Sequence, residues 1–302
     1  MALTLDFAFE GFRIIRERPM LILFWAPVLL LSQVMSTVIL ILMAGPEFMA
    51  MMEMQRNNGA TDPDAVMSML SLMQKVTPAT AAAFIVSMLF SAIVLCAVYR
   101  AVLGGTGDRA GFLKFGKDEL RQIVVSVLLL CFVVLLAIVS TIALLILGSV
   151  LIGGLSVPNT VVASVTGVVS VAFYIWLLVR LSLIPVQSFD QGRINFTGSF
   201  KLTKGHFWQL LSGYTVAIIM IFLVITLCEI IFAAVAVSAL GGDMGSLNVV
   251  YQRDFSKLEN LNNPAIIGYM LMSALRAPLL SAIMIGAQAA AYKLLKNNHA
   301  TI

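Results

Sequence analysis

Two side chains of opposite charge stand inside long apolar stretches of this sequence. Glu229 and Arg276 each lie roughly 11 residues from the loop that joins their stretches, which at a helical rise of about 1.5 Å per residue is close to the middle of a bilayer. A lone charge at that depth costs several kcal/mol, so we expect the two residues to form an ion pair. Gln33 stands at a comparable depth in another apolar stretch and can reach the same layer.

Such a pair supports two kinds of chemistry. As a structural contact it would hold two helices together. As a functional site it would bind a substrate, an ion or a proton, because ionisable residues inside a membrane are the default candidates for such roles. The sequence favours the structural contact and leaves the functional site as the alternative.

No set of residues typical of an enzyme accompanies the pair. HExxH, GxSxG and Walker motifs are absent, and the two histidines are His206 and His299. Cys96, Cys131 and Cys228 lie inside apolar stretches without metal-ligand spacing. We therefore expect no catalytic site, no metal site and no cofactor.

The composition indicates a membrane protein. Of the 302 residues 60% are hydrophobic and 11% are charged, and the mean hydropathy is +1.00. Apolar stretches long enough to cross a bilayer, about 20 residues each, must be helical in lipid because every backbone polar group needs a partner. The sequence therefore predicts one all-α transmembrane domain over residues 1–302, with six spans at Met20–Ala44, Ala79–Leu103, Gln122–Gly148, Val161–Ile184, Leu210–Leu240 and Ala265–Leu295.

The positive charges predict how the chain lies in the membrane. Most of the 19 lysine and arginine residues fall at the termini or beside the second and fourth loops, and the positive-inside rule then makes both termini cytoplasmic. Basic segments beside an anionic leaflet account for the net charge of +4, so no nucleic-acid partner is expected. An aromatic belt at the inner membrane boundary is predicted from Trp25, Tyr99, Trp208 and Tyr292.

A basic motif occurs three times, each time directly before an apolar stretch. Residues 111–117 and 198–204 share the pattern Gly-x2-Lys-x2-Lys, and residues 12–17 carry a similar spacing with arginine. The chain is therefore predicted to hold three parallel helical-hairpin repeats, at about 4–104, 105–185 and 193–297, each preceded by a cytoplasmic interfacial amphipathic helix. The residues expected to face lipid headgroups are Arg13, Arg16, Lys114, Lys117, Lys201 and Lys204.

Small residues at a four-residue spacing indicate where helices touch. Along the sixth stretch they include Ala282, Gly286 and Ala290. Such faces let helix backbones approach closely. The sixth helix is therefore predicted to be surrounded by protein.

The first outer loop, residues 45–78, is rich in methionine on both sides of a turn signal at Asn58-Gly59. Two amphipathic helices that lie on the outer leaflet or cover the bundle are the favoured prediction. The alternatives are docking of a partner on an adaptable methionine surface and binding of Cu(I) by thioethers.

Residues 180–210 carry a longer pattern, in which Arg180-x4-Pro185 is followed by Phe196-x2-Ser199-Phe200-x-Leu202-Thr203-x-Gly205-x2-Trp208-x-Leu210. This pattern resembles bacterial six-helix inner-membrane proteins, among them the membrane domain that accompanies glycerophosphodiester phosphodiesterases. The resemblance implies a membrane module in the bacterial inner membrane. The hydrolase activity in that family belongs to a separate soluble domain, whose acidic metal site this chain lacks.

Two classes of function fit these features. The first is a non-enzymatic multi-pass module: a scaffold, assembly factor or subunit that binds phospholipid, another membrane protein or a second copy of the chain. The second is a transporter or channel for a small or amphiphilic solute, which would use the layer of Glu229 and Arg276. A water-filled cavity that reaches Glu229 would favour transport, whereas a dry and enclosed pair would favour the module.

Overall fold

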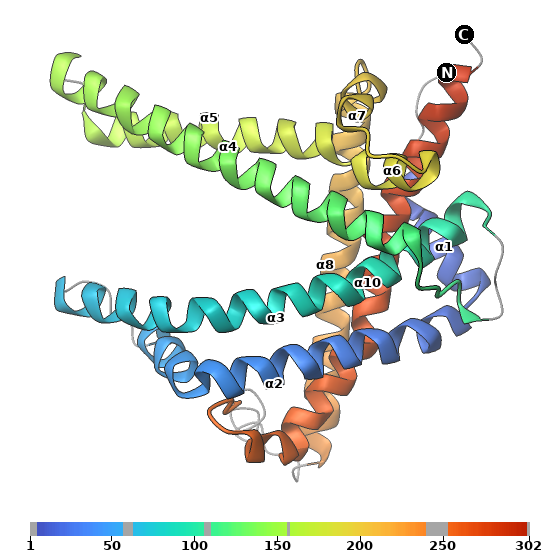
Figure 1. The fold of residues 1–302 in the computed structure, drawn as a ribbon, viewed down its shortest axis with the longest axis horizontal. Coiled ribbons are helices and arrows are strands. Elements are labelled where there is room, and N and C mark those ends of the chain that lie inside the picture. The colour runs from blue at the N-terminus through green and yellow to red at the C-terminus, as the bar shows by residue number, and fades with distance from the viewer. Residues whose placement is uncertain (1–4, 57–62, 106–109, 156–157, 240–252, 301–302) are drawn as a thin grey trace.

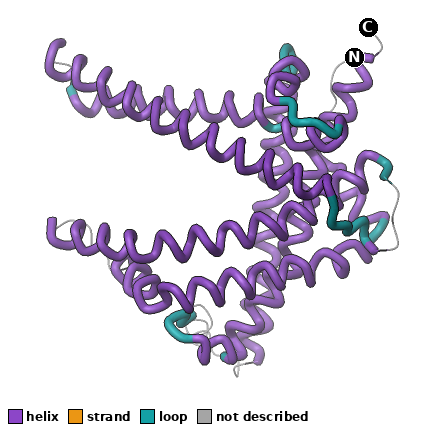
Figure 2. Tube along the Cα trace, viewed as in Figure 1, coloured by secondary structure: helices purple, strands orange, loops and turns teal. Residues whose placement is uncertain are grey.

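The computed structural model describes residues 5–56, 63–105, 110–155, 158–239 and 253–300. These residues are mostly helical and include no strand (Figure 2). Within these ranges six helices are long and apolar enough to cross a membrane, as the composition predicts. The elements are η1 (Leu5–Phe9), α1 (Glu10–Glu17), α2 (Met20–Arg56), α3 (Pro63–Leu103), α4 (Lys117–Leu155), α5 (Asn159–Leu181), α6 (Ile184–Gln191), α7 (Phe196–Leu202), α8 (Phe207–Ala239), η4 (Leu258–Asn262) and α10 (Pro264–Ala300).

Both ends of the chain lie on one side of the molecule (Figure 1). There α1, α6 and α7 lie beside the starts of α2, α4 and α8 and the end of α10. We call this the terminal side. An even number of membrane crossings gives this arrangement. The opposite ends of the six long helices, which we call the loop side, diverge: those of the first two hairpins point left in Figure 1, and those of α8 and α10 point down.

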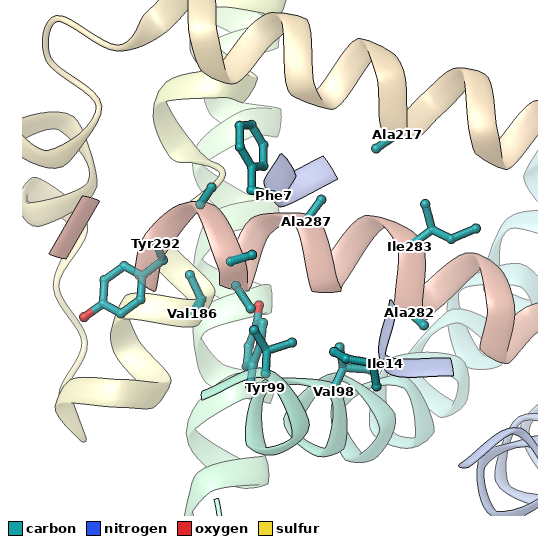
Figure 3. Close-up of a cluster of buried hydrophobic side chains, with 14 of the residues drawn as sticks. Phe7, Ile14, Val98, Tyr99, Val186, Ala217, Ala282, Ile283, Ala287 and Tyr292 are labelled. Atoms are coloured by element: carbon teal, nitrogen blue, oxygen red, sulfur yellow. The ribbon is translucent and has the colours of Figure 1, made fainter. Parts of the chain in front are cut away.

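The last helix, α10, is at the centre of the packing. α1, α2, α3 and α8 all pack against it, and its apolar window is the most buried of the six. Figure 3 shows Ile283, Ala287 and Tyr292 of α10 among buried side chains from several other elements. The prediction that protein surrounds the sixth helix is confirmed for its terminal-side half, whereas Ile267, Leu271 and Leu275 toward its start are exposed.

Close backbone contact fixes the N-terminal segment against α10. A Cβ atom added to Gly286 would lie 2.9 Å from the Cα atom of Gly11, so these two glycines mark the crossing of α1 and α10. The ring of Phe7 packs against Gly213 of α8 in the same way. The glycines therefore allow η1 and α1 to pack on both helices at once.

Of the two helices predicted in the methionine-rich residues 45–78, the first is present beyond a break in α2, whereas the prediction of a separate second helix is wrong. α2 continues to Arg56 after a break at Ala44 (φ −158°, ψ 30°), and α3 continues through Pro78. Pro46 follows the break in the first turn of the new segment, where its missing N–H costs little. The segment is therefore an extension of the first hairpin, and the turn at Asn58-Gly59 lies outside the described residues.

The three basic segments do not share one structure. The short helices α1 and α7 precede the first and third hairpins, but residues 113–115 before α4 are not helical. Gly111 and Phe112 have φ values of 62° and 60°, which a right-handed helix cannot contain. The Gly111 carbonyl also accepts a hydrogen bond from Trp25 Nε1 at 2.8 Å. The predicted amphipathic helix before the second hairpin is therefore wrong.

The predicted aromatic belt is largely absent. Trp25, Tyr99 and Tyr292 expose at most 1% of their surface, whereas Trp208 exposes 77%. The three buried rings belong to the hydrophobic core. They fill the space where the helix ends converge on the terminal side, and large rings supply that volume best.

The hairpin of α4 and α5 stands apart from the other long helices. Its helix α4 approaches α3 near the terminal side and diverges from it toward the loop side (Figure 1). In the apolar stretch of α4 that could span a membrane, 6% of the residues are buried, against 39% in the corresponding stretch of α10. Most of the apolar surface of this hairpin is therefore left for lipid or for another protein to cover.

Candidate functional site

Glu229 on α8 and Arg276 on α10 form the ion pair that the sequence predicts. Arg276 Nη1 donates a hydrogen bond to Glu229 Oε1. The two side chains expose 36% and 17% of their surface, with the carboxylate the more exposed. Each charge lowers the cost of placing the other in an apolar environment.

The pair lies nearer the loop side than the midpoint of its helices. At about 1.5 Å per residue, Glu229 is roughly 33 Å from the terminal-side end of α8 and roughly 15 Å from its loop-side end. Arg276 is about 18 Å from the loop-side end of α10, so the expected equal depth is present. The pair can lie away from the midpoints of the two helices because both helices are longer than the roughly 20 residues that a bilayer requires.

Gln33 does not join the pair. Among the described residues it donates no hydrogen bond to Glu229 and has none with Arg276. The polar contact of α2 lies one turn further along, where Ser36 Oγ donates to the Ala83 carbonyl at 3.1 Å. Ser36 therefore links α2 to α3 rather than to the Glu229 layer.

A second ion pair, which is not among the predicted site residues, is far more buried. Arg100 at the end of α3 and Glu119 in the first turn of α4 are 2.5 Å apart, and their side chains expose 9% and 1%. Arg100 also donates to the Phe112 carbonyl at 3.1 Å. Glu119 accepts the backbone N–H of Gly116 at 2.9 Å. The pair thus ties α3, α4 and the turn between them into one unit.

A sequence signal for this second pair exists. Glu119 stands three residues after Gly116, and a glutamate at that spacing caps the start of a helix by accepting a backbone N–H. Arg100 stands at the end of an apolar stretch, where the positive-inside rule alone accounts for an arginine. The capping pattern predicts the bond to Gly116, but only the fold brings Arg100 to the same carboxylate.

The residues of the pattern at 180–210 join α5 to α7. Ser199 Oγ donates to the Arg180 carbonyl at 2.5 Å, and Arg180 Nη1 donates to Thr203 Oγ1 at 3.1 Å. Asn195 caps α7 by accepting the backbone N–H of Gly198 at 2.9 Å. The guanidinium of Arg180 also lies over the ring of Trp176, 5.7 Å from its centre. The pattern therefore describes a structural junction.

All six basic side chains predicted to face headgroups are exposed, and their elements lie on the terminal side. Arg13 pairs with Glu10 at 2.6 Å. Lys201 on α7 and Lys204 just after it have no acidic partner within 4 Å among the described residues. These two lysines are therefore available to anions from outside the chain.

A cavity of about 480 Å³ lies between the α4–α5 hairpin and the pair α8 and α10. Its wall is mainly aliphatic and contains a few polar groups, from Ser182, Tyr214, Thr215 and Gln288. We call it the α5–α8 cavity. Neither Glu229 nor Arg276 lines it, so the cavity and the ion pair are separate features.

His206 and the acidic side chains of the described residues are dispersed along the chain. No group of three or more His, Cys, Asp or Glu residues is placed to hold a metal ion in that part of the chain. His206 Nδ1 is 2.7 Å from Gln209 Oε1, within the turn that leads into α8. Known family models, curated proteins and solved structures were compared with the chain, and none of them matches it.

Proposed function

We propose that this chain is a non-enzymatic multi-pass membrane module, a scaffold, assembly factor or subunit that binds phospholipid through its terminal side. The observation that carries the proposal is the set of six exposed basic side chains on that side, together with exposed aromatic rings of Phe9, Phe115 and Trp208. Cationic side chains attract anionic headgroups, and aromatic rings favour the boundary between headgroups and hydrocarbon.

The proposal assigns the terminal side to the cytoplasmic face of the bacterial inner membrane. The distribution of lysine and arginine supports this orientation. The resemblance of residues 180–210 to inner-membrane modules supports the location. The basic segments before the three hairpins then act as contacts to the inner leaflet, two of them as short helices and one as a turn.

Another membrane protein or a second copy of the chain is the further partner that a scaffold requires. The α4–α5 hairpin supports this part of the proposal, because its apolar surface is covered least by the rest of the chain. Short helices and turns on the terminal side leave little chain for a separate soluble domain within the described residues.

Extraction of the full-length protein from its native membrane with a lipid-retaining polymer tests the module. Lipids and proteins in the particles are identified and compared with the bulk membrane. We expect enrichment of anionic phospholipid, with or without one membrane protein in fixed proportion. Particles with bulk lipid composition and no such protein would overturn the proposal.

A transporter or channel is the second candidate function. The Glu229–Arg276 pair favours it, because ionisable groups within a membrane often mark the route of an ion or solute. The pair is partly exposed, yet it does not line the α5–α8 cavity. A transporter would lose solute flux in a Glu229→Gln variant that still folds, whereas a module would lose only stability.

A further inference from the structure

The α5–α8 cavity lies within the half of the helices next to the terminal side. On α8 its wall runs from Leu211 to Ile218, and on α10 from Met284 to Gln288. It therefore begins about 6 Å from the start of α8, at a rise of about 1.5 Å per residue. This is the depth at which the upper part of a phospholipid acyl chain lies beneath its headgroup.

The cavity cannot enclose a helix of a partner protein. From Leu211 to Ile218 it is about 10 Å long. A helix segment of that length, with a diameter of about 10–12 Å, fills roughly 800 Å³ or more, so against the 480 Å³ of the cavity it could lie only across the opening. A hydrocarbon chain fits, because neighbouring non-bonded carbons need a separation of only about 4 Å.

Of the polar side chains in the wall, Gln288 is the one that can meet the ester region of a phospholipid, since Ser182, Tyr214 and Thr215 bond within the chain. Gln288 has no hydrogen-bond partner among the described residues, although its side chain faces an apolar cavity. Ser182 Oγ and Tyr214 OH, also in the wall, are 2.8 Å apart. An unpaired amide in such surroundings costs free energy unless an occupant supplies a partner. Ester carbonyl oxygens accept hydrogen bonds and stand directly above the chains.

Two exposed cations before the start of α8 favour an anionic lipid. Lys204 precedes the cavity-lining Leu211 by seven residues, and Lys201 stands three residues before Lys204, near the end of α7. Both side chains are exposed and lack an acidic partner within 4 Å in the described part of the chain. A phosphate above the cavity would meet these two cations at the headgroup level.

We propose that the α5–α8 cavity binds one acyl chain of an anionic phospholipid, with the ester at Gln288 and the phosphate at Lys201 and Lys204. This inference rests on the proposed function, since it names one lipid site within the lipid-binding module. It goes further because it fixes the position, the number of chains and the charge of the lipid.

Titration of the delipidated full-length protein with palmitoyl-oleoyl phosphatidylglycerol, followed by native mass spectrometry, tests the site. Thr215→Trp places a large ring in the cavity and is expected to weaken the first binding step about tenfold or more, because excluding two methylenes suffices for that. Thr226→Trp is the matched control. Both threonines are exposed on α8 and bond to the carbonyl four residues earlier, but Thr226 does not line the cavity.

The charge of the lipid is tested with palmitoyl-oleoyl phosphatidylcholine. The parent is expected to bind phosphatidylglycerol more tightly than phosphatidylcholine. In a Lys201→Ala/Lys204→Ala variant the ratio of the two affinities is expected to fall by up to roughly fivefold for each lysine removed. Equal binding by Thr215→Trp and the parent would overturn the cavity as the site. Equal binding of the two lipids by the parent would overturn the anionic occupant. Neither result decides the proposed function, because that function is tested by the enrichment of lipid in native particles.

Discussion

The Glu229–Arg276 pair has the contact expected of two opposite charges in lipid, and the partial exposure of the carboxylate separates it from a buried structural pair. The depth of the two residues follows from counting along two helices joined by a loop. Their displacement toward the loop side does not, because it depends on the full lengths of α8 and α10.

Removing one charge of this pair should cost more than removing both. Glu229→Gln leaves Arg276 without a counterion in an apolar layer, and we expect a loss of about 2 kcal/mol. Glu229→Gln/Arg276→Gln should recover most of that loss. Thermal unfolding in mild detergent gives the order of the midpoints, with Glu53→Gln on the exposed extension of α2 as the control. If Glu229→Gln is as stable as the parent, the pair does not stabilise the fold.

The buried pair of Arg100 and Glu119 should matter more for stability than a surface pair. Glu119→Gln leaves the 9% exposed guanidinium of Arg100 with only the more distant carboxylate of Asp118, at 3.6 Å, and weakens the cap at Gly116, so we expect a loss of about 2 kcal/mol. Arg13→Gln breaks a contact whose arginine is 58% exposed, and a loss under about 1 kcal/mol is expected. Similar unfolding midpoints for the two variants would contradict this ranking.

Among the elements, the central position of α10 was predictable and the structure of the second basic segment was not. The small residues of α10 recur at helical spacing, which is a local pattern in the sequence. The second basic segment resembles the third in composition, yet its turn depends on the positive φ values at Gly111 and Phe112 and on the distant Trp25. Contacts of that range cannot be deduced from spacing.

Two glycines of α10 should respond differently to the same change. A Cβ on Gly286 meets the Gly11 backbone at 2.9 Å, so Gly286→Ala should force α1 away and cost about 1–3 kcal/mol. A Cβ on Gly268 meets Phe232 at 3.7 Å, an ordinary contact, and Gly268→Ala should be neutral or stabilise by up to about 1 kcal/mol. Unfolding midpoints of the two variants check this, and a stable Gly286→Ala protein would refute the close crossing.

At the scale of the whole molecule, six long helices and a terminal side that collects both chain ends follow from composition and from an even number of crossings. The separation of the α4–α5 hairpin does not follow from them. Its helices are as apolar as the others, and hydropathy gives no preference between packing against protein and facing lipid. The α5–α8 cavity results from that separation, so it too was beyond prediction from the sequence.

The ratio of anionic to zwitterionic phospholipid around the protein tests the lipid-binding module most directly. The measurement compares native polymer-bounded particles of the parent with those of a Lys117→Ala/Lys201→Ala/Lys204→Ala variant, each against the membrane from which it was extracted. We predict an anionic excess around the parent that falls to the bulk value in the variant, because these cations lie on the exposed terminal side. A parent particle with the bulk ratio would contradict the proposal that this chain is a module for anionic phospholipid.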